Sequence, residues 1–193
     1  MDDALPLGSR EYFLMLALLA FGRGMDFLST WVATPNLVLE GNPIARKLGW
    51  KWGALFNVVI MLALGRWMLP SIVVTTASVL VAARNFQLAW LMHSMGEEAY
   101  REWHVRRVQE TRIALFLFCL AGNTILTASV GAAVTYFGRS LAVVGMGMGI
   151  VAYAIAVAFY TLLSVWRLHR AVKREGRRRE AAQNALPVEN AWN

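Results

Sequence analysis

The sequence predicts an all-α, polytopic integral membrane protein, a helix bundle with five transmembrane helices. Of its 193 residues, 58% are hydrophobic and 16% are charged, whereas soluble globular domains are about half apolar and a quarter charged. The apolar residues gather in five segments, most of which reach or approach the ~20 residues that cross a bilayer. This composition excludes a disordered chain and argues against a water-soluble enzyme.

The five expected spans follow the apolar segments in chain order. Their approximate bounds are 12–33, 52–67, 71–92, 113–137 and 141–166. We expect the first segment to be a retained helix and not a signal peptide. Asp2, Asp3 and Glu11 outweigh Arg10 around its start, which is the wrong charge for a signal sequence.

Two tight turns divide the longer apolar stretches. As one helix, residues 52–92 would be about 60 Å long at ~1.5 Å per residue, which is twice the bilayer core. Pro70 supplies the break, because a proline disfavours helix at the residue before it. Arg139 and its aromatic and glycine neighbours separate the last two spans. We therefore expect a single membrane domain over 1–193 that ends in a basic tail, 167–193.

The basic residues predict the orientation. When loops are assigned alternately to two sides, one side receives only Arg10, Arg66 and Arg139, and most of the other basic residues fall opposite. The positive-inside rule then predicts an N-out/C-in protein of the cytoplasmic (inner) membrane. The net charge of +7 is explained by these loops and by anionic lipid headgroups at the tail, and not by nucleic acid.

The first polar cluster begins inside the first span. Arg23 and Asp26 are three residues apart and share a helix face. Charges in a span are costly and usually pair with one another inside the bundle, so we expect this pair to form close to Thr30. The following loop could fold back so that Glu40 or Asn42 meets Asp26 at the membrane surface.

Two interpretations of this cluster remain open. It can be a buried polar knot that fixes the first loop against the bundle. It can also be a site for a cation or a lipid headgroup, built from Asp26 and Glu40, since hard cations prefer oxygen ligands. Pro43 favours a helix start and predicts a short interfacial helix over 44–48.

The pattern Asp-x-x-x-Thr, Glu-x-Asn-Pro and an apolar hairpin resembles a family of small, uncharacterised prokaryotic multi-pass membrane proteins, a domain of unknown function. The resemblance covers about residues 11–92. Its matching residues are Asp26, Thr30, Glu40, Asn42 and Pro43. Asn57 stands where the family tends to carry a lysine early in its second span. The resemblance implies about three spans and a polar cluster, and it implies no activity.

A second cluster, Arg84 with Asn85, lies in the third span. An intramembrane arginine suggests a functional site by default, so Arg84 either contacts a substrate or lipid phosphate or pairs with Asp26. In the loop 93–112, His93, Glu97 and His104 have helical spacing that can be read as a metal site. We favour a solvated connecting helix there, because Glu-x-x-His is absent, and we expect no metal and no cofactor.

Small residues predict how the last helices pack. Gly145 and Gly149 form a small-xxx-small pair that lets helices approach closely, and we expect Gly131 of the fourth span to face them. Cys119, the single cysteine, excludes an internal disulfide. It lies in an apolar run, where a small buried side chain is expected.

The sequence has few residues arranged for catalysis and many small residues arranged for close helix packing. This favours a non-catalytic accessory or scaffold subunit of a membrane assembly. Its partner would be another membrane protein or a second copy. The alternative is a small transporter or an ion- or lipid-binding protein that uses Asp26, Glu40 and Arg84. An enzyme is the weakest of the three, since no hydroxyl side chain has a histidine at a telling spacing.

Overall fold

The computed structural model describes residues 3–38, 40 and 42–184, and these residues form six helices. In chain order the helices are α1 (Arg10–Ala33), α2 (Pro43–Leu64), α3 (Met68–Met95), α4 (Glu97–Glu110), α5 (Ile113–Phe137) and α6 (Leu141–Asn184). Five of them are long and apolar enough to cross a membrane, and α4 is the exception. The predicted all-α fold with five spans is confirmed.

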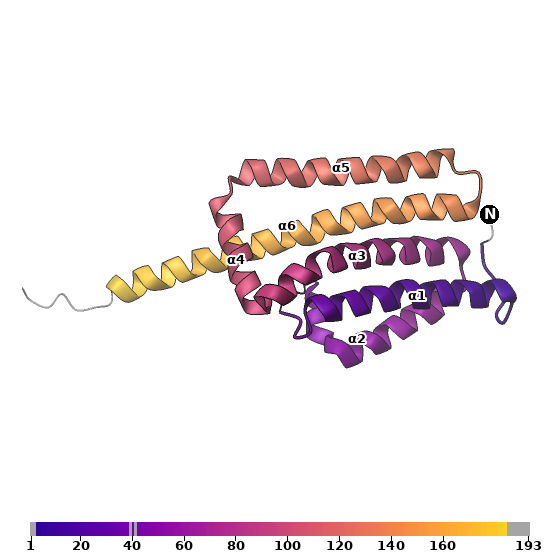
Figure 1. Ribbon diagram of the computed structural model, residues 1–193, viewed down its shortest axis with the longest axis horizontal. Coiled ribbons are helices and arrows are strands. Elements are labelled where there is room, and N and C mark those ends of the chain that lie inside the picture. The colour runs from indigo at the N-terminus through magenta and orange to yellow at the C-terminus, as the bar shows by residue number, and fades with distance from the viewer. Residues whose placement is uncertain (1–2, 39, 41, 185–193) are drawn as a thin grey trace, which may run out of the picture.

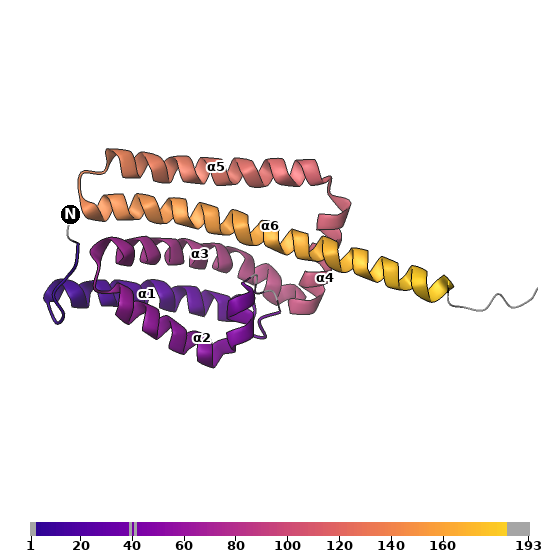
Figure 2. The same cartoon turned by 180° about the vertical axis from the view of Figure 1, so that it is seen from behind.

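The long helices lie roughly side by side. In Figure 1 the order across the molecule is α5, α6, α3 and α1, and α2 leans against α1 at the far edge. The short α4 crosses the bundle end at which α3 finishes and α5 begins, and Figure 2 shows the same arrangement from behind. The α2–α3 and α5–α6 turns lie at the other end, beside the N-terminus.

The second helix starts earlier than the hydropathy predicts, at Pro43 and not near residue 52. Asn42 is its N-cap and accepts a hydrogen bond from the backbone N–H of Ile44 at 3.0 Å, while proline at the first position suits a helix start. Gly49 interrupts the helix with φ 64°, a conformation that favours glycine. The predicted short helix after Pro43 is therefore present, and the span proper follows the kink.

The turn between α2 and α3 also differs from the prediction. The second helix ends at Leu64, and α3 begins at Met68, so Pro70 lies in the first turn of a helix, where its missing N–H is not needed. The N-terminal segment covers this turn. The backbone N–H of Leu5 donates to the Arg66 carbonyl at 2.7 Å, and the Asp3 carboxylate accepts from the N–H of Leu69 at 3.2 Å.

Glycines set the closest helix contacts. A Cβ on Gly149 would lie 2.6 Å from Cβ of Thr76, and one on Gly145 would lie 3.0 Å from Ile72, so this pair faces α3. The expectation that Gly131 faces them is wrong. A Cβ on Gly131 would lie 2.7 Å from the carbonyl of Gly147, because alternate glycines along α6 point to different neighbours.

The helix α5 is the least covered of the five. Gly131 is the one buried residue of α5, all of which the structure describes. Large apolar side chains such as Phe118 (76% exposed) and Leu126 (70% exposed) point outward, as expected for a surface in contact with lipid. The expectation that Cys119 is buried is also wrong, because its side chain is exposed and α5 has a packed neighbour on one side only.

Candidate functional site

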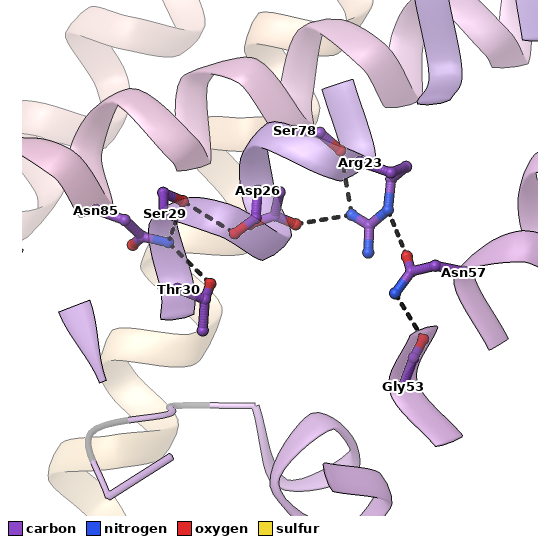
Figure 3. A network of polar contacts seen from close by, with 8 residues as sticks. All are labelled: Arg23, Asp26, Ser29, Thr30, Gly53, Asn57, Ser78 and Asn85. Carbon is purple, nitrogen blue, oxygen red and sulfur yellow. Dashed lines mark hydrogen bonds and ion pairs between the residues drawn. The ribbon is translucent and has the colours of Figure 1, made fainter. Parts of the chain in front are cut away.

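A polar network inside the spans connects three helices around Arg23 of α1. The Arg23 Nη1 atom donates to the Asp26 carboxylate at 2.9 Å and to the Ser78 hydroxyl of α3 at 3.1 Å. Its Nε atom donates to the amide oxygen of Asn57, from α2, at 2.7 Å. Figure 3 shows the guanidinium between these groups. The predicted Arg23–Asp26 pair is confirmed, with two further partners.

Asn57 is oriented by its own helix. Its amide NH₂ donates to the backbone carbonyl of Gly53, one turn earlier, at 2.8 Å, which leaves the amide oxygen facing Arg23 (Figure 3). Gly53 is buried against the Phe27 ring of α1, with about 3.7 Å between an added Cβ and that ring. The small residue lets α2 approach α1 at this level, and Asn57 joins the two helices.

The second half of the network joins α1 to α3 alone. The amide NH₂ of Asn85 donates to the hydroxyls of Ser29, at 3.3 Å, and Thr30, at 3.2 Å. The Ser29 hydroxyl in turn donates to the backbone carbonyl of Asp26 at 2.9 Å. These bonds satisfy polar groups that hydrocarbon would otherwise leave unpaired, and such groups are expensive to leave alone in a membrane.

A groove of about 560 Å³ opens beside the network, between α1 and α2. Its lining combines Arg23 and Asn57 with apolar and aromatic side chains: Ala20, Gly24, Phe27, Leu28, Trp31, Trp50, Ala54 and Met61. The Arg23 and Asp26 side chains are 26% and 19% exposed. The groove can therefore take an apolar chain, with a guanidinium at its wall.

Trp50 is one of the aromatic residues that line this groove. Its ring lies edge-on to Phe27, with 5.0 Å between the ring centroids, and its indole N–H donates to the carbonyl of Pro35 at 2.9 Å. The Gly49 kink immediately before it turns the chain. An indole with an apolar body and a polar tip suits the membrane surface.

A second polar contact lies outside the spans, where Glu97 at the start of α4 holds the loop after α1. Its carboxylate accepts from the Thr34 hydroxyl at 2.7 Å and from the backbone N–H groups of Asn36, at 3.0 Å, and Val38, at 3.3 Å. Leu37, between these two, has φ 56°, a costly conformation for a residue with a side chain. The carboxylate holds the chain on both sides of it.

These bonds change the acidity of Glu97. Desolvation works to raise its pKa, but the hydrogen bonds from Thr34, Asn36 and Val38 together outweigh it and hold the pKa below the ordinary glutamate value. Glu97 and His93 also line an open cleft of about 580 Å³ at this corner.

The pKa of Glu40 shifts in the opposite direction, upward from the ordinary glutamate value. Burial raises the pKa of its carboxyl, the hydrogen bond from the backbone N–H of Asn42 (2.7 Å) works against this, and the negative charge of Asp26 raises it further. Glu40 therefore lies within electrostatic range of Asp26. Asn42, however, caps α2.

The structure brings together most of the predicted site residues but excludes Arg84. Arg23, Asp26, Thr30 and Asn85 share the network, whereas Asp26 pairs with Arg23 and not with Arg84. The charge of Arg84 acts instead on Tyr100 of α4. Asn57 and Ser78 complete the network and were missed. A lone polar side chain in an apolar run was the signal available for Asn57, whereas Ser78 is one of several hydroxyl residues in its span.

The possible metal site in the loop 93–112 does not form as one helix. Gly96, with φ 81°, separates His93 in α3 from Glu97 in α4, so these residues do not have the four-residue helical spacing assumed. Among the described residues, no group of three or more His, Cys, Asp or Glu side chains is placed to hold a metal ion.

Comparison with known proteins adds no relative: no protein-family model matches the sequence, and neither a curated protein nor a solved structure matches it significantly.

Proposed function

We propose that this multi-pass membrane protein is a non-catalytic subunit of a membrane assembly, and that α5 is the helix by which it joins its partner. The observation that carries the proposal is the position of α5. It packs against α6 at the edge of the row (Figure 1), and its other faces are exposed along the whole span. A helix with one neighbour has room for a second.

The polar groups of the spans support a structural role. Arg23 is engaged by three side chains, and Asn85 by two. Groups held this way fix helices against one another, because each would be costly to separate in hydrocarbon. A catalytic constellation needs instead a nucleophile and a base within reach of one another.

The orientation is part of the same proposal. Five spans place the two termini on opposite sides of the bilayer, and the α1–α2 loop, α4 and the extension of α6 lie at one end (Figure 1). Their basic residues support an N-out/C-in chain in the cytoplasmic membrane, with anionic headgroups near the tail. A reporter fused after Asn193 should be active only in the cytoplasm, and activity only outside would overturn this orientation.

The experiment that tests the assembly role is purification of the full chain from native membranes in a gentle detergent, followed by native mass spectrometry. We expect a stoichiometric complex with another polypeptide or with further copies of the chain. A monomer that carries neither would overturn the proposal. As a control for dissociation by the detergent, the complex is cross-linked chemically in intact membranes before extraction.

A second candidate function rests on the groove between α1 and α2. Its aromatic lining and the Arg23 guanidinium suit a lipid whose acyl chain lies in the groove and whose polar end meets Arg23. Native mass spectrometry with defined lipids tests it. Trp31→Ala should lower the occupancy of a bound lipid, and Trp90→Ala, at an exposed tryptophan of α3 outside the groove, should leave it unchanged.

A further inference from the structure

Asn123 lies in the middle of α5. At about 1.5 Å per residue it is roughly 15 Å from the start of the helix at Ile113 and 21 Å from its end at Phe137. That depth is beyond the reach of a short side chain to either surface. The side chain is exposed, and among the described residues no hydrogen bond joins it to another group.

The neighbouring polar residue shows the contrast. Thr124 donates its hydroxyl to the carbonyl of Leu120 in its own helix at 2.8 Å, which is the usual solution for a threonine in a span. An asparagine carries two amide donors and a carbonyl acceptor. Leaving these groups in hydrocarbon is costly, because hydrocarbon offers them no hydrogen bonds in place of those made with water. A partner is therefore expected at this depth.

Asn123 belongs to an exposed stripe with heptad spacing. The members of this Asn123 stripe are separated alternately by four and three residues: Cys119, Asn123, Leu126, Val130, Ala133 and Phe137. This spacing is the pattern by which one helix packs along another in a left-handed coil. The stripe lies to one side of Gly131, which marks the face against α6.

We propose that the Asn123 stripe binds the same stripe of a second copy of this chain, an inference that rests on the proposed role of α5 in assembly. All copies insert in one direction, so two α5 helices that meet in a bilayer are parallel. A two-fold axis along the membrane normal then places every stripe residue opposite itself. Asn123 meets Asn123, and each carboxamide donates to the oxygen of the other.

A second copy fits this site better than an unrelated helix for a chemical reason. The carboxamide is both donor and acceptor, so it is complementary to itself, and symmetry supplies the matching group at the correct depth. A single asparagine at such a position is known to fix both register and oligomeric state in helical dimers. The other exposed flank of α5 carries Phe118, Ile125 and Tyr136 and suits lipid.

The chain carries its own probe for this arrangement. Cys119 is the single cysteine, it is exposed, and it lies one turn before Asn123 on the stripe. In the symmetric dimer the two Cys119 residues face one another at a separation that a disulfide can bridge. Treating membranes that contain the full chain with copper–phenanthroline should therefore give a disulfide-linked dimer, which is read on a non-reducing gel.

Two variants make the test specific. Asn123→Leu replaces the amide by an apolar side chain that suits lipid at an exposed position, so the monomer should fold. The cross-linked fraction at limiting protein density should fall about tenfold. The double variant Cys119→Ser/Phe118→Cys moves the thiol to an exposed position at the same depth but about 100° round the helix. It should not cross-link.

Three outcomes overturn the proposal. They are absence of a Cys119 dimer, equal cross-linking from position 118, and an Asn123→Leu chain that cross-links as well as the original. If the chain proves to be bound to a different polypeptide with no homodimer, the second-copy inference fails while the assembly role stands. If the chain is monomeric with no partner at all, both fail.

Discussion

Two helix pairs of the molecule, α1–α3 and α5–α6, are held together in different ways. Helix α1 is joined to α3 by side-chain hydrogen bonds, from Arg23 to Ser78 and from Asn85 to Ser29 and Thr30. Helix α5 meets α6 through the backbones of Gly131 and Gly147. The polar side chains near that second contact bond within their own helix, as Thr135 does to the Gly131 carbonyl at 2.8 Å.

The two kinds of contact are therefore disrupted by different kinds of substitution. A hydrogen-bonded pair fails when one partner is removed, because the other is left unpaired in hydrocarbon. A glycine contact fails when an atom is added, because close packing leaves no room for it. Removing one polar partner tests the first kind of contact and adding a methyl group tests the second, so matched substitutions should separate the two.

The largest effect is expected from breaking the charge pair. Arg23→Leu leaves the Asp26 carboxylate in the span without its counter-ion, and we expect a loss of about 3–5 kcal/mol in the free energy of unfolding, measured by steric trapping in bicelles. The double variant Arg23→Leu/Asp26→Leu should recover much of this loss. Additive losses in the double variant would mean that the two side chains do not depend on one another.

The glycine contact should respond to a single methyl group. A Cβ at Gly147 would lie 2.6 Å from the carbonyl of Gly131 and 2.5 Å from the backbone N of Thr135. Gly147→Ala should therefore separate α5 from α6 and cost about 1–3 kcal/mol, measured in the same assay. Gly122→Ala is the control, because nothing lies within 4 Å of its added Cβ. Equal losses would refute the close-contact explanation.

At the membrane surface, the Glu97 contact is a third joint of the hydrogen-bonded kind. Glu97→Gln replaces one of the two carboxylate oxygens by an amide NH₂, which cannot accept from Thr34 and Val38. We expect a loss of about 1–2 kcal/mol, together with faster hydrogen exchange in the loop after α1. Glu98→Gln alters only an exposed pair with Arg101 at 3.7 Å and should change neither quantity.

The smallest effect is a dependence on pH, with opposite signs at two glutamates. The pKa of Glu97 is lowered in the folded protein, so its contribution is present above about pH 4.5 and is lost as the pH falls through the depressed value. The pKa of Glu40 is raised, so its ionisation opposes folding as the pH rises through the raised value. Glu40→Gln should therefore remove a loss of stability above that pH, and Glu97→Gln a loss at acidic pH, in thermal unfolding curves.

The sequence predicted the positions of the spans better than their rotation. Hydropathy located all five, and charge spacing predicted the Arg23–Asp26 pair, because both signals are local. Asn57 and Ser78 were missed, Asn57 as one polar residue in an apolar run and Ser78 as one of several hydroxyl residues in its span, and neither pattern gives the direction of the side chain. Whether it faces lipid or a neighbour depends on how α2 and α3 are turned toward α1, which tertiary packing decides. The exposure of Cys119 was missed for the same reason, since it depends on how α5 is turned against α6.

Helix α6 is both a span and a spacer. Its apolar part ends near Leu168, where the guanidinium of Arg170 lies 3.8 Å from the ring centroid of Trp166, yet the helix continues to Asn184. At about 1.5 Å per residue those last turns carry the chain roughly 24 Å farther, about three times the ~8 Å over which salt screens charge. A straight α6 therefore keeps only its first turn or two beyond Leu168 within electrostatic reach of the headgroups and carries the rest of its backbone past that range.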